Sequence, residues 1–146
     1  MRKDKKAYNK YYSVPNITAE LALEAIHAAL QIAQREGIRI SIAVVDTSLA
    51  LVAFVRADHA TPHSAETSRR KANTAASTGK TTGWMPPELS ISLPLGTGNL
   101  LTNIPGGVPI RFQGTLVGGL GVAGGTVEQD ALVATRVLGA IEADLP

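Results

Sequence analysis

Three residues of this chain could together transfer protons and hold an anion near neutral pH. Asp58 and His59 are adjacent, and Lys71 follows in a segment of small residues. An imidazole titrates close to neutral pH, a carboxylate can accept a proton, and a lysine can bind a carboxylate. This combination is typical of a cofactor-independent enzyme that acts by acid–base chemistry on a small carboxylated metabolite, with Asp58, His59 and Lys71 as catalytic residues. Because Lys71 directly follows Arg69 and Arg70, a solvated helix face is the competing interpretation.

The histidines are a second group of residues that could do chemistry. His27 lies at the margin of the apolar face of a predicted helix, and His63 follows Pro62. Imidazole nitrogens commonly ligate metal ions and cofactors, so His27 and His63 are candidate cofactor ligands, although a plain surface role for His27 is the alternative. His59 and His63 could also approach a metal ion with Asp58. Two imidazoles and one carboxylate fall short of the usual ligand set, and we predict no metal site.

The glycines are concentrated in one part of the chain. Ten of the fourteen lie between Gly96 and Gly125. Such clustering indicates backbone that turns tightly or passes close to another group. We therefore predict that this part forms one wall of a small-molecule site and faces residues 58–74. The predicted cofactor-binding residues in it are Gly106, Gly107, Pro109, Gly124, Gly125 and Thr126.

Composition and charge exclude several classes of protein. The chain has no cysteine, which excludes disulfides, thiolate zinc sites and cysteine nucleophiles. Residues 1–11 hold five basic side chains and one acid, so the net charge of +2 comes from this segment, and nucleic-acid binding is not predicted. No apolar run approaches the roughly 20 residues that cross a bilayer, so we expect a cytoplasmic protein without a membrane partner. We expect a basic, flexible arm over residues 1–15 and a single domain over residues 16–146.

The hydrophobic pattern alternates between helical and extended periods. Adjacent strands are separated by short turns, which favours hairpins and hence an antiparallel sheet of the α+β class. The segment 81–105 shows little periodicity and contains a possible short helix at 87–93. The other predicted elements are helices at 18–36, 63–77 and 126–143 and strands at 38–46, 51–56, 109–112 and 116–122.

Several segments in a fixed order resemble one protein family. They are 42–46 (IAVVD), 51–58 (LVAFVRAD), 71–75 (KANTA), 106–110 (GGVPI) and 119–130 (GLGVAGGTVEQD). In these segments, and over about residues 18–142, the chain resembles the GlcG/HbpS family, which is similar to the C-terminal domain of PduO and was formerly a domain of unknown function. The chain departs from the family at residues 57–60, where Met-Asp-Gly-Ala is replaced by Ala-Asp-His-Ala, so that His59 stands in place of a glycine.

The resemblance implies a fold and a ligand. It implies a profilin-like α/β sandwich with a five-stranded antiparallel sheet flanked by helices, in which the fifth strand would fall within the irregular segment 81–105. It also implies a homo-oligomer, from dimer to octamer. The implied function is that of an accessory protein of a metabolic pathway that binds haem or another tetrapyrrole, with the haem ligand coming from the 18–36 helix.

Overall fold

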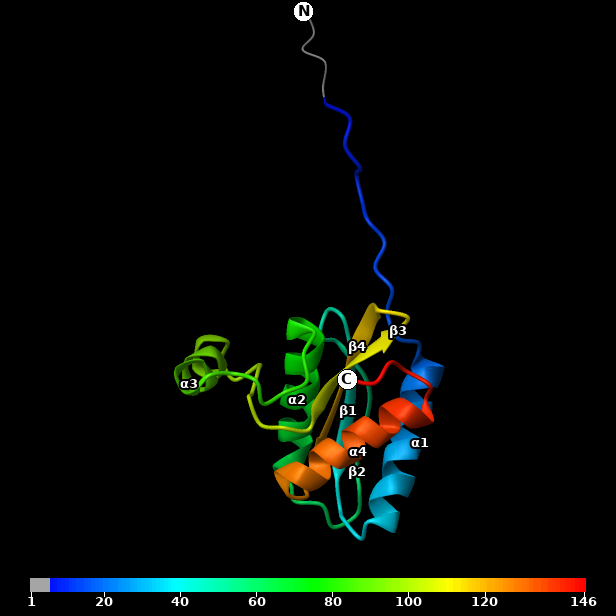
Figure 1. Ribbon diagram of the computed structural model, residues 1–146, viewed down its shortest axis with the longest axis vertical. Helices are drawn as coiled ribbons and strands as arrows, with labels where there is room; N and C mark the ends of the chain where they lie inside the picture. The colour runs from blue at the N-terminus through cyan, green and yellow to red at the C-terminus, as the bar shows by residue number, and fades with distance from the viewer. Residues whose placement is uncertain (1–5) are drawn as a thin grey trace, which may run out of the picture.

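The computed structural model describes residues 6–146, which form a sheet covered by helices on both faces (Figure 1). Helices α1 (Ala19–Arg35) and α4 (Val127–Ala140) cover one face, and α2 (Ser64–Thr78) covers the other. A fourth helix, α3 (Pro87–Gly96), projects from this body. The α+β class predicted from the sequence is confirmed.

The sheet has four strands in the order β2-β1-β4-β3, and every neighbouring pair is antiparallel. The family resemblance implied five strands, but no fifth strand forms within residues 6–146. Segment 81–105 instead forms α3 and loops. It contains four prolines, which lack the N–H that a strand donates to its neighbour. The strands are β1 (Ser41–Asp46), β2 (Leu51–Arg56), β3 (Gly107–Phe112) and β4 (Thr115–Ala123).

The two faces of the sheet pack in different ways. The larger core lies between the sheet and the helices α1 and α4, and it is built from long aliphatic side chains such as Ile42, Leu120 and Leu138. The face under α2 carries a small cluster that includes Ala72 and Ala76. Small side chains let the α2 backbone approach the sheet closely, so residues of α2 and β4 share one narrow interface.

Capping residues fix where the helices begin and end. The Thr18 hydroxyl accepts a hydrogen bond from the Leu21 N–H at the start of α1. At the start of α4, the Thr126 hydroxyl accepts from the Gln129 N–H, and the Gln129 side chain accepts from the Thr126 N–H. Gly79 ends α2 in the left-handed conformation, with φ 68°. These caps fix the start of α1, the start of α4 and the end of α2.

Residues 6–16 run away from the body in an extended conformation (Figure 1). The Ile17 N–H donates to the Val117 carbonyl, and the Asn16 side chain accepts from the Thr47 N–H, which fixes the point where the chain joins the body. Residues 1–5 of the predicted basic arm lie outside the described residues. No helix within residues 6–146 is long and apolar enough to span a membrane.

Candidate functional site

Lys71 and Asp130 form a buried ion pair between α2 and α4. The Lys71 Nζ donates to the Asp130 Oδ2 at 2.9 Å and to the Val122 carbonyl at 2.8 Å. Lys71 is 1% exposed and Asp130 is 2% exposed. The Asp130 Oδ1 accepts from the Gly125 N–H at 2.9 Å. Both charges are therefore compensated inside the protein, which excludes the solvated helix face as an explanation of Lys71.

Burial and the pairing with Asp130 shift the pKa of Lys71 in opposite directions. Removal from water disfavours the ammonium and lowers the pKa of Lys71 below its ordinary value, whereas the hydrogen bond and the charge of Asp130 raise it. Burial is the larger effect, so the net direction is downward. A lysine with a lowered pKa gives up its proton more readily than a surface lysine, so Lys71 suits proton transfer.

The segment from Gly106 to Pro109 closes one side of this ion pair. A Cβ on Gly106 would lie 2.6 Å from the Val122 carbonyl oxygen and 2.9 Å from the Lys71 Nζ. Gly106 also has a φ of 126°, a backbone angle that residues with a side chain rarely adopt. Gly107 and Pro109 are buried as well. Neither glycine lines a cavity that we find in residues 6–146, and Pro109 lines a small one of about 40 Å³ beside the C-terminal residues, away from Lys71. The predicted open wall is wrong here, because the backbone packs directly on Lys71.

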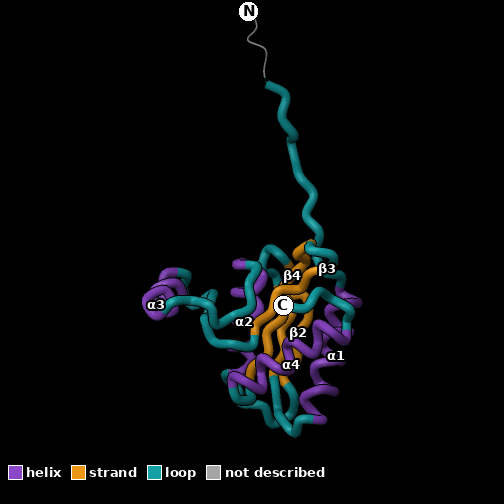
Figure 2. Tube along the Cα trace, viewed as in Figure 1, coloured by secondary structure: helices purple, strands orange, loops and turns teal. Residues whose placement is uncertain are grey.

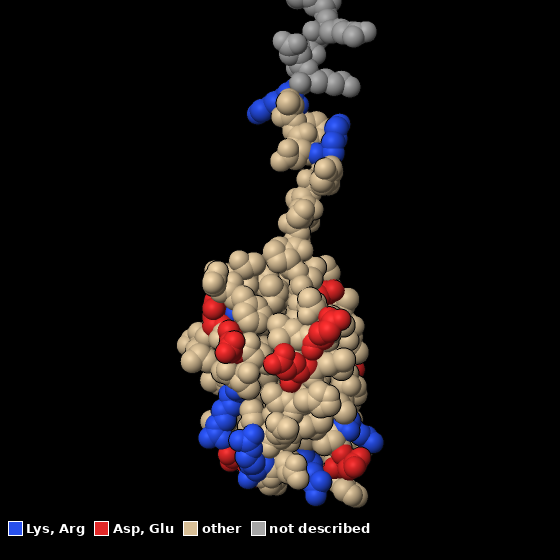
Figure 3. All heavy atoms as spheres, turned by 90° about the vertical axis from the view of Figure 1, so that its right-hand side faces the viewer, with Lys and Arg blue, Asp and Glu red and all other residues tan. Residues whose placement is uncertain are grey.

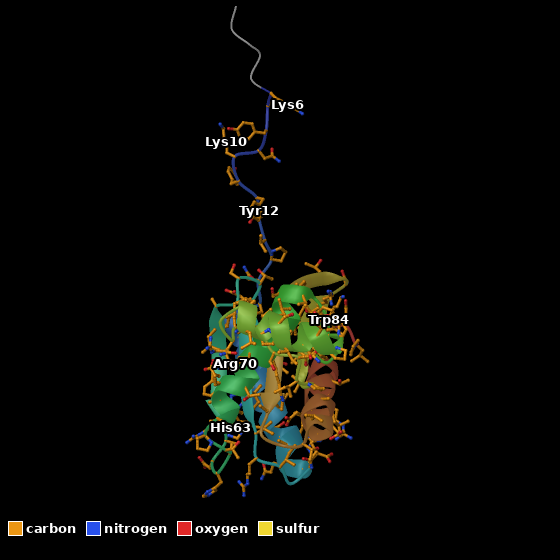
Figure 4. All side chains as sticks on the ribbon, turned by 90° about the vertical axis from the view of Figure 1, so that its left-hand side faces the viewer. Lys6, Lys10, Tyr12, His63, Arg70 and Trp84 are labelled. Atoms are coloured by element: carbon orange, nitrogen blue, oxygen red, sulfur yellow. The ribbon has the colours of Figure 1, made fainter. Side chains whose placement is uncertain are left out.

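A cavity of about 300 Å³ opens on the other side of the pair, and we call it the Lys71 cavity. It brings together four predicted site residues, namely His63, Lys71, Gly124 and Gly125, whereas Thr126 caps α4 beside it. The His63 side chain makes no capping hydrogen bond, and Figure 4 shows it at the end of the body farthest from the N-terminal arm. The other lining residues are Thr61, Ser64, Thr67, Ile104, Ala123, Val127 and Asp130.

The structure does not bring the three predicted catalytic residues together. Asp58 and His59 are exposed, and Asp58 lines a different cavity from Lys71. The aspartate beside Lys71 is Asp130, which sequence reasoning missed because an acid in the first turn of a helix looks like a favourable charge at the helix N-terminus. No group of three potential metal ligands occurs within residues 6–146. The catalytic role of Asp58 and His59 stays a prediction.

His59 adopts a backbone conformation that favours glycine. Its φ is 67°, in the left-handed region, and this is the position at which the resembling family carries glycine. We therefore expect His59→Gly to raise the free energy of unfolding by about 0.5–1 kcal/mol, measured by urea denaturation. The same change in the middle of α1, His27→Gly, provides the control and should lower stability by about 0.5–1 kcal/mol. A His59→Gly protein that unfolds at lower urea than the parent would contradict the strain argument.

The second cavity, of about 460 Å³, lies between the end of α1 and β2, and we call it the α1–β2 cavity. Its lining is largely apolar, with Leu30 and Ala33 from α1 and Val55 from β2. His27 is exposed one helical turn before Leu30 on the same helix. The other lining residues are Gln34, Gly37, Ile38, Arg39, Ile40, Arg56, Ala57 and Asp58.

Two arginines line the α1–β2 cavity, and sequence reasoning missed both as site residues. Arg39 and Arg56 are exposed, and neither has an ion-pair partner within residues 6–146. Figure 3 shows basic side chains gathered at the end of the body farthest from the N-terminal arm. Arg39 precedes β1 and Arg56 ends β2, so the antiparallel pairing of these two strands brings the two arginines close together. A search for local sequence motifs does not reveal this proximity.

Comparison with known proteins adds a family to this geometry. The family model described as haem degrading protein HbpS-like matches residues 17–138. Protein GlcG of Escherichia coli K12 is 36% identical over 108 residues, which cover 73% of this chain and 81% of GlcG.

Solved structures agree with the fold. The crystal structure of Klebsiella pneumoniae protein ORFY has a TM-score of 0.85 at 28% identity and covers 94% of this chain and 98% of its own. The crystal structure of a PduOC haem complex has a TM-score of 0.83 at 24% identity, covering 89% of this chain and 98% of its own. The similarity to the PduOC structure supports the fold alone.

Proposed function

The chain belongs to the HbpS-like family, and on this premise we propose that it is an accessory protein that binds haem or another tetrapyrrole. The family description names haem, and the structurally similar PduOC is a haem complex. The observation that carries the proposal is the α1–β2 cavity, which combines a largely apolar lining, two exposed arginines and a nearby imidazole.

The residues around this cavity fit what a tetrapyrrole requires. Ligand cavities in proteins typically measure 300–1,000 Å³ and are mainly apolar, and this cavity measures about 460 Å³. The apolar side chains of Leu30, Ala33 and Val55 suit the edge of a macrocycle. Haem supplies an iron that takes an axial imidazole, and His27 would hold it from α1. Arg39 and Arg56 would hold the two propionate carboxylates.

His27 and His63 are not equally well placed to ligate haem. His27 lies on α1 and His63 at the start of α2, which are helices on opposite faces of the sheet. One haem cannot therefore use both imidazoles of a single copy. The Lys71 cavity, beside His63, is smaller and holds a buried ion pair, so it suits a macrocycle poorly. We assign the haem to His27 and the α1–β2 cavity.

Titration of the apo-protein with haem, followed through the Soret band, tests this assignment. We expect saturable binding in the parent and in His63→Ala, and a loss of affinity of at least about tenfold in His27→Ala. Arg39→Gln combined with Arg56→Gln should also weaken binding, whereas Arg35→Gln, in the last turn of α1 and outside the cavity, should not. An unchanged Soret titration in His27→Ala, or no saturable shift in the parent, would overturn the proposal.

We also propose that the protein is a homo-oligomer, because α3 lacks a partner within residues 6–146. No residue of α3 is buried, no other helix or strand in residues 6–146 packs against it, and Figure 2 shows it standing away from the body. Ile91 is 65% exposed and Leu95 is 70% exposed. An isolated helix of ten residues with an internal proline is not stable in water by itself. A second copy of the chain would bury these side chains.

Disruption of α3 should therefore change the oligomeric state. We expect the parent to elute as an oligomer in size-exclusion chromatography with light scattering, and Ile91→Lys combined with Leu95→Lys to elute as a monomer. Leu132→Lys, at an exposed apolar position on α4, is the control and should leave the mass unchanged. If the α3 variant keeps the parent mass, α3 is not the interface.

A further inference from the structure

The Lys71 cavity contains a buried ammonium whose hydrogen-bonding capacity is only partly used. A lysine side chain carries three N–H donors. The Lys71 Nζ uses two of them, toward the Asp130 Oδ2 and the Val122 carbonyl, and no third acceptor occurs within residues 6–146. Because a buried donor without an acceptor costs free energy, the third N–H requires an acceptor from elsewhere.

That acceptor can enter only from the cavity. Gly106 packs on the other side of the pair, where even an added Cβ would lie 2.9 Å from the Lys71 Nζ and 3.0 Å from the Asp130 Cβ. On the open side, Lys71 lines the cavity of about 300 Å³ together with Gly124 and Gly125. A ligand in the cavity would therefore lie within reach of the ammonium, and the fold closes every approach through the 106–109 segment.

The charges around the cavity favour a single negative charge on the ligand. The first turns of α2 and α4, at Ser64 and Val127, both line the cavity, and helix N-termini carry partial positive charge. Asp130 lies in the same cavity, but Lys71 and the Gly125 N–H occupy its two oxygens. Its negative charge disfavours a dianion such as phosphate more strongly than a monoanion.

The size and the apolar residues of the cavity define the rest of the ligand. Its volume is at the lower end of the range for ligand cavities, so a molecule of a few non-hydrogen atoms fits. Ile104, Ala123 and Val127 provide contacts for a short aliphatic group. We infer that the Lys71 cavity binds a small organic monocarboxylate with a short aliphatic body. This site is separate from the haem site proposed above and does not depend on it.

Propionate is a suitable probe, and its binding can be followed by calorimetry and by amide NMR in carboxylate-free buffer. We expect saturable binding that shifts the Gly124 and Gly125 amide signals. Propylammonium and propanol, which lack the anion, should not bind saturably. In a buffer at pH 8, where inorganic phosphate is mainly a dianion, succinate and phosphate should bind at least about tenfold more weakly than propionate, because each brings a second negative charge next to Asp130.

Two tryptophan variants on α4 separate the cavity from the rest of the surface. Val127 and Leu132 are each 41% exposed, but only Val127 lines the cavity. We expect Val127→Trp to fill the cavity and weaken propionate binding at least about tenfold, whereas Leu132→Trp should stay within about twofold of the parent. Neither change touches the ion pair, so both variants should fold, which thermal unfolding can verify.

Three results would overturn the assignment. The first is the absence of Gly124 and Gly125 shifts with propionate, and the second is equal propionate affinity in Val127→Trp and the parent. The third is phosphate binding as tightly as propionate, which would assign the cavity to a dianion. The haem titration of Val127→Trp should match that of the parent. Loss of the Soret shift there would place the tetrapyrrole in this cavity, whereas loss only in His27→Ala leaves the carboxylate site intact.

Discussion

We expect Lys71→Met to lower the free energy of unfolding by about 3–5 kcal/mol near neutral pH. The methionine has a similar length and apolar stem, so the change mainly removes the ammonium. It leaves the Asp130 carboxylate, 2% exposed, with the Gly125 N–H as its remaining hydrogen-bond donor within residues 6–146. A buried charge without a counter-ion is among the most destabilising features in a protein, and small domains have only about 5–15 kcal/mol in total. Urea denaturation at constant pH measures the loss.

The pH dependence of this loss identifies its cause. Uptake of a proton by Asp130 in the variant removes the unpaired charge, so the folded variant binds a proton that the unfolded chain releases more easily. The deficit relative to the parent should therefore be smaller near pH 5 than near pH 8. A deficit that is the same at both pH values would indicate lost packing instead of an unpaired carboxylate.

Two further variants complete this experiment. Lys71→Met combined with Asp130→Leu removes both charges and should recover most of the lost stability, because apolar replacement of a buried pair is often neutral. Arg136→Met breaks the ion pair with Glu36 at the surface, where the side chains are 49% and 38% exposed. It should cost at most about 1 kcal/mol. If the surface change costs as much as Lys71→Met, burial does not set the strength of the pair.

Most secondary structure follows from local patterns in this sequence. The strand at 51–56 is observed as predicted, and the predicted helices at 18–36 and 63–77 match α1 and α2 to within about a residue. The ends are set by caps such as Thr18 and Gly79, which are visible in the sequence. Helix α4 ends at Ala140 instead of residue 143, because the final turn gives way to a non-helical end whose Glu142 has φ 58°. Local signals therefore locate the elements but not every end, since the strand predicted at 38–46 begins at Ser41.

The site was less predictable, because its contacts join distant parts of the chain. The sequence marks Lys71 as a candidate, but its partner Asp130 lies 59 positions away, at the start of a helix that covers the opposite face of the sheet, so no local pattern relates the two. Arg39 and Arg56 meet through the β1–β2 hairpin and carry no motif. The glycine cluster predicts an open wall, whereas the structure shows close packing. A close helix–sheet contact produces the same clustering, and the sequence does not distinguish the two.

This helix–sheet contact leads to the second large effect, that of Gly121→Ala. A Cβ on Gly121 would collide with the Ser68 carbonyl oxygen. It would also lie 2.6 Å from the Ala72 backbone nitrogen and 3.0 Å from the Lys71 Cβ. The first two are backbone atoms in the middle of α2, so they cannot move without shifting the whole helix from the sheet. We expect a loss of at least about 3 kcal/mol in the free energy of unfolding, measured by urea denaturation, or failure to accumulate as soluble protein.

Gly139→Ala is the matched control, because it makes the same chemical change where there is room. Gly139 lies in α4, and an added Cβ there meets nothing within 4 Å. Alanine favours the helix over glycine, so this variant should gain about 0.5–1 kcal/mol. A loss of unfolding free energy in Gly121→Ala together with a gain in Gly139→Ala would establish that the glycines of β4 allow the contact with α2. A Gly121→Ala protein as stable as the parent would mean that α2 can separate from the sheet at little cost, and the packing that holds Lys71 in place would then not be rigid.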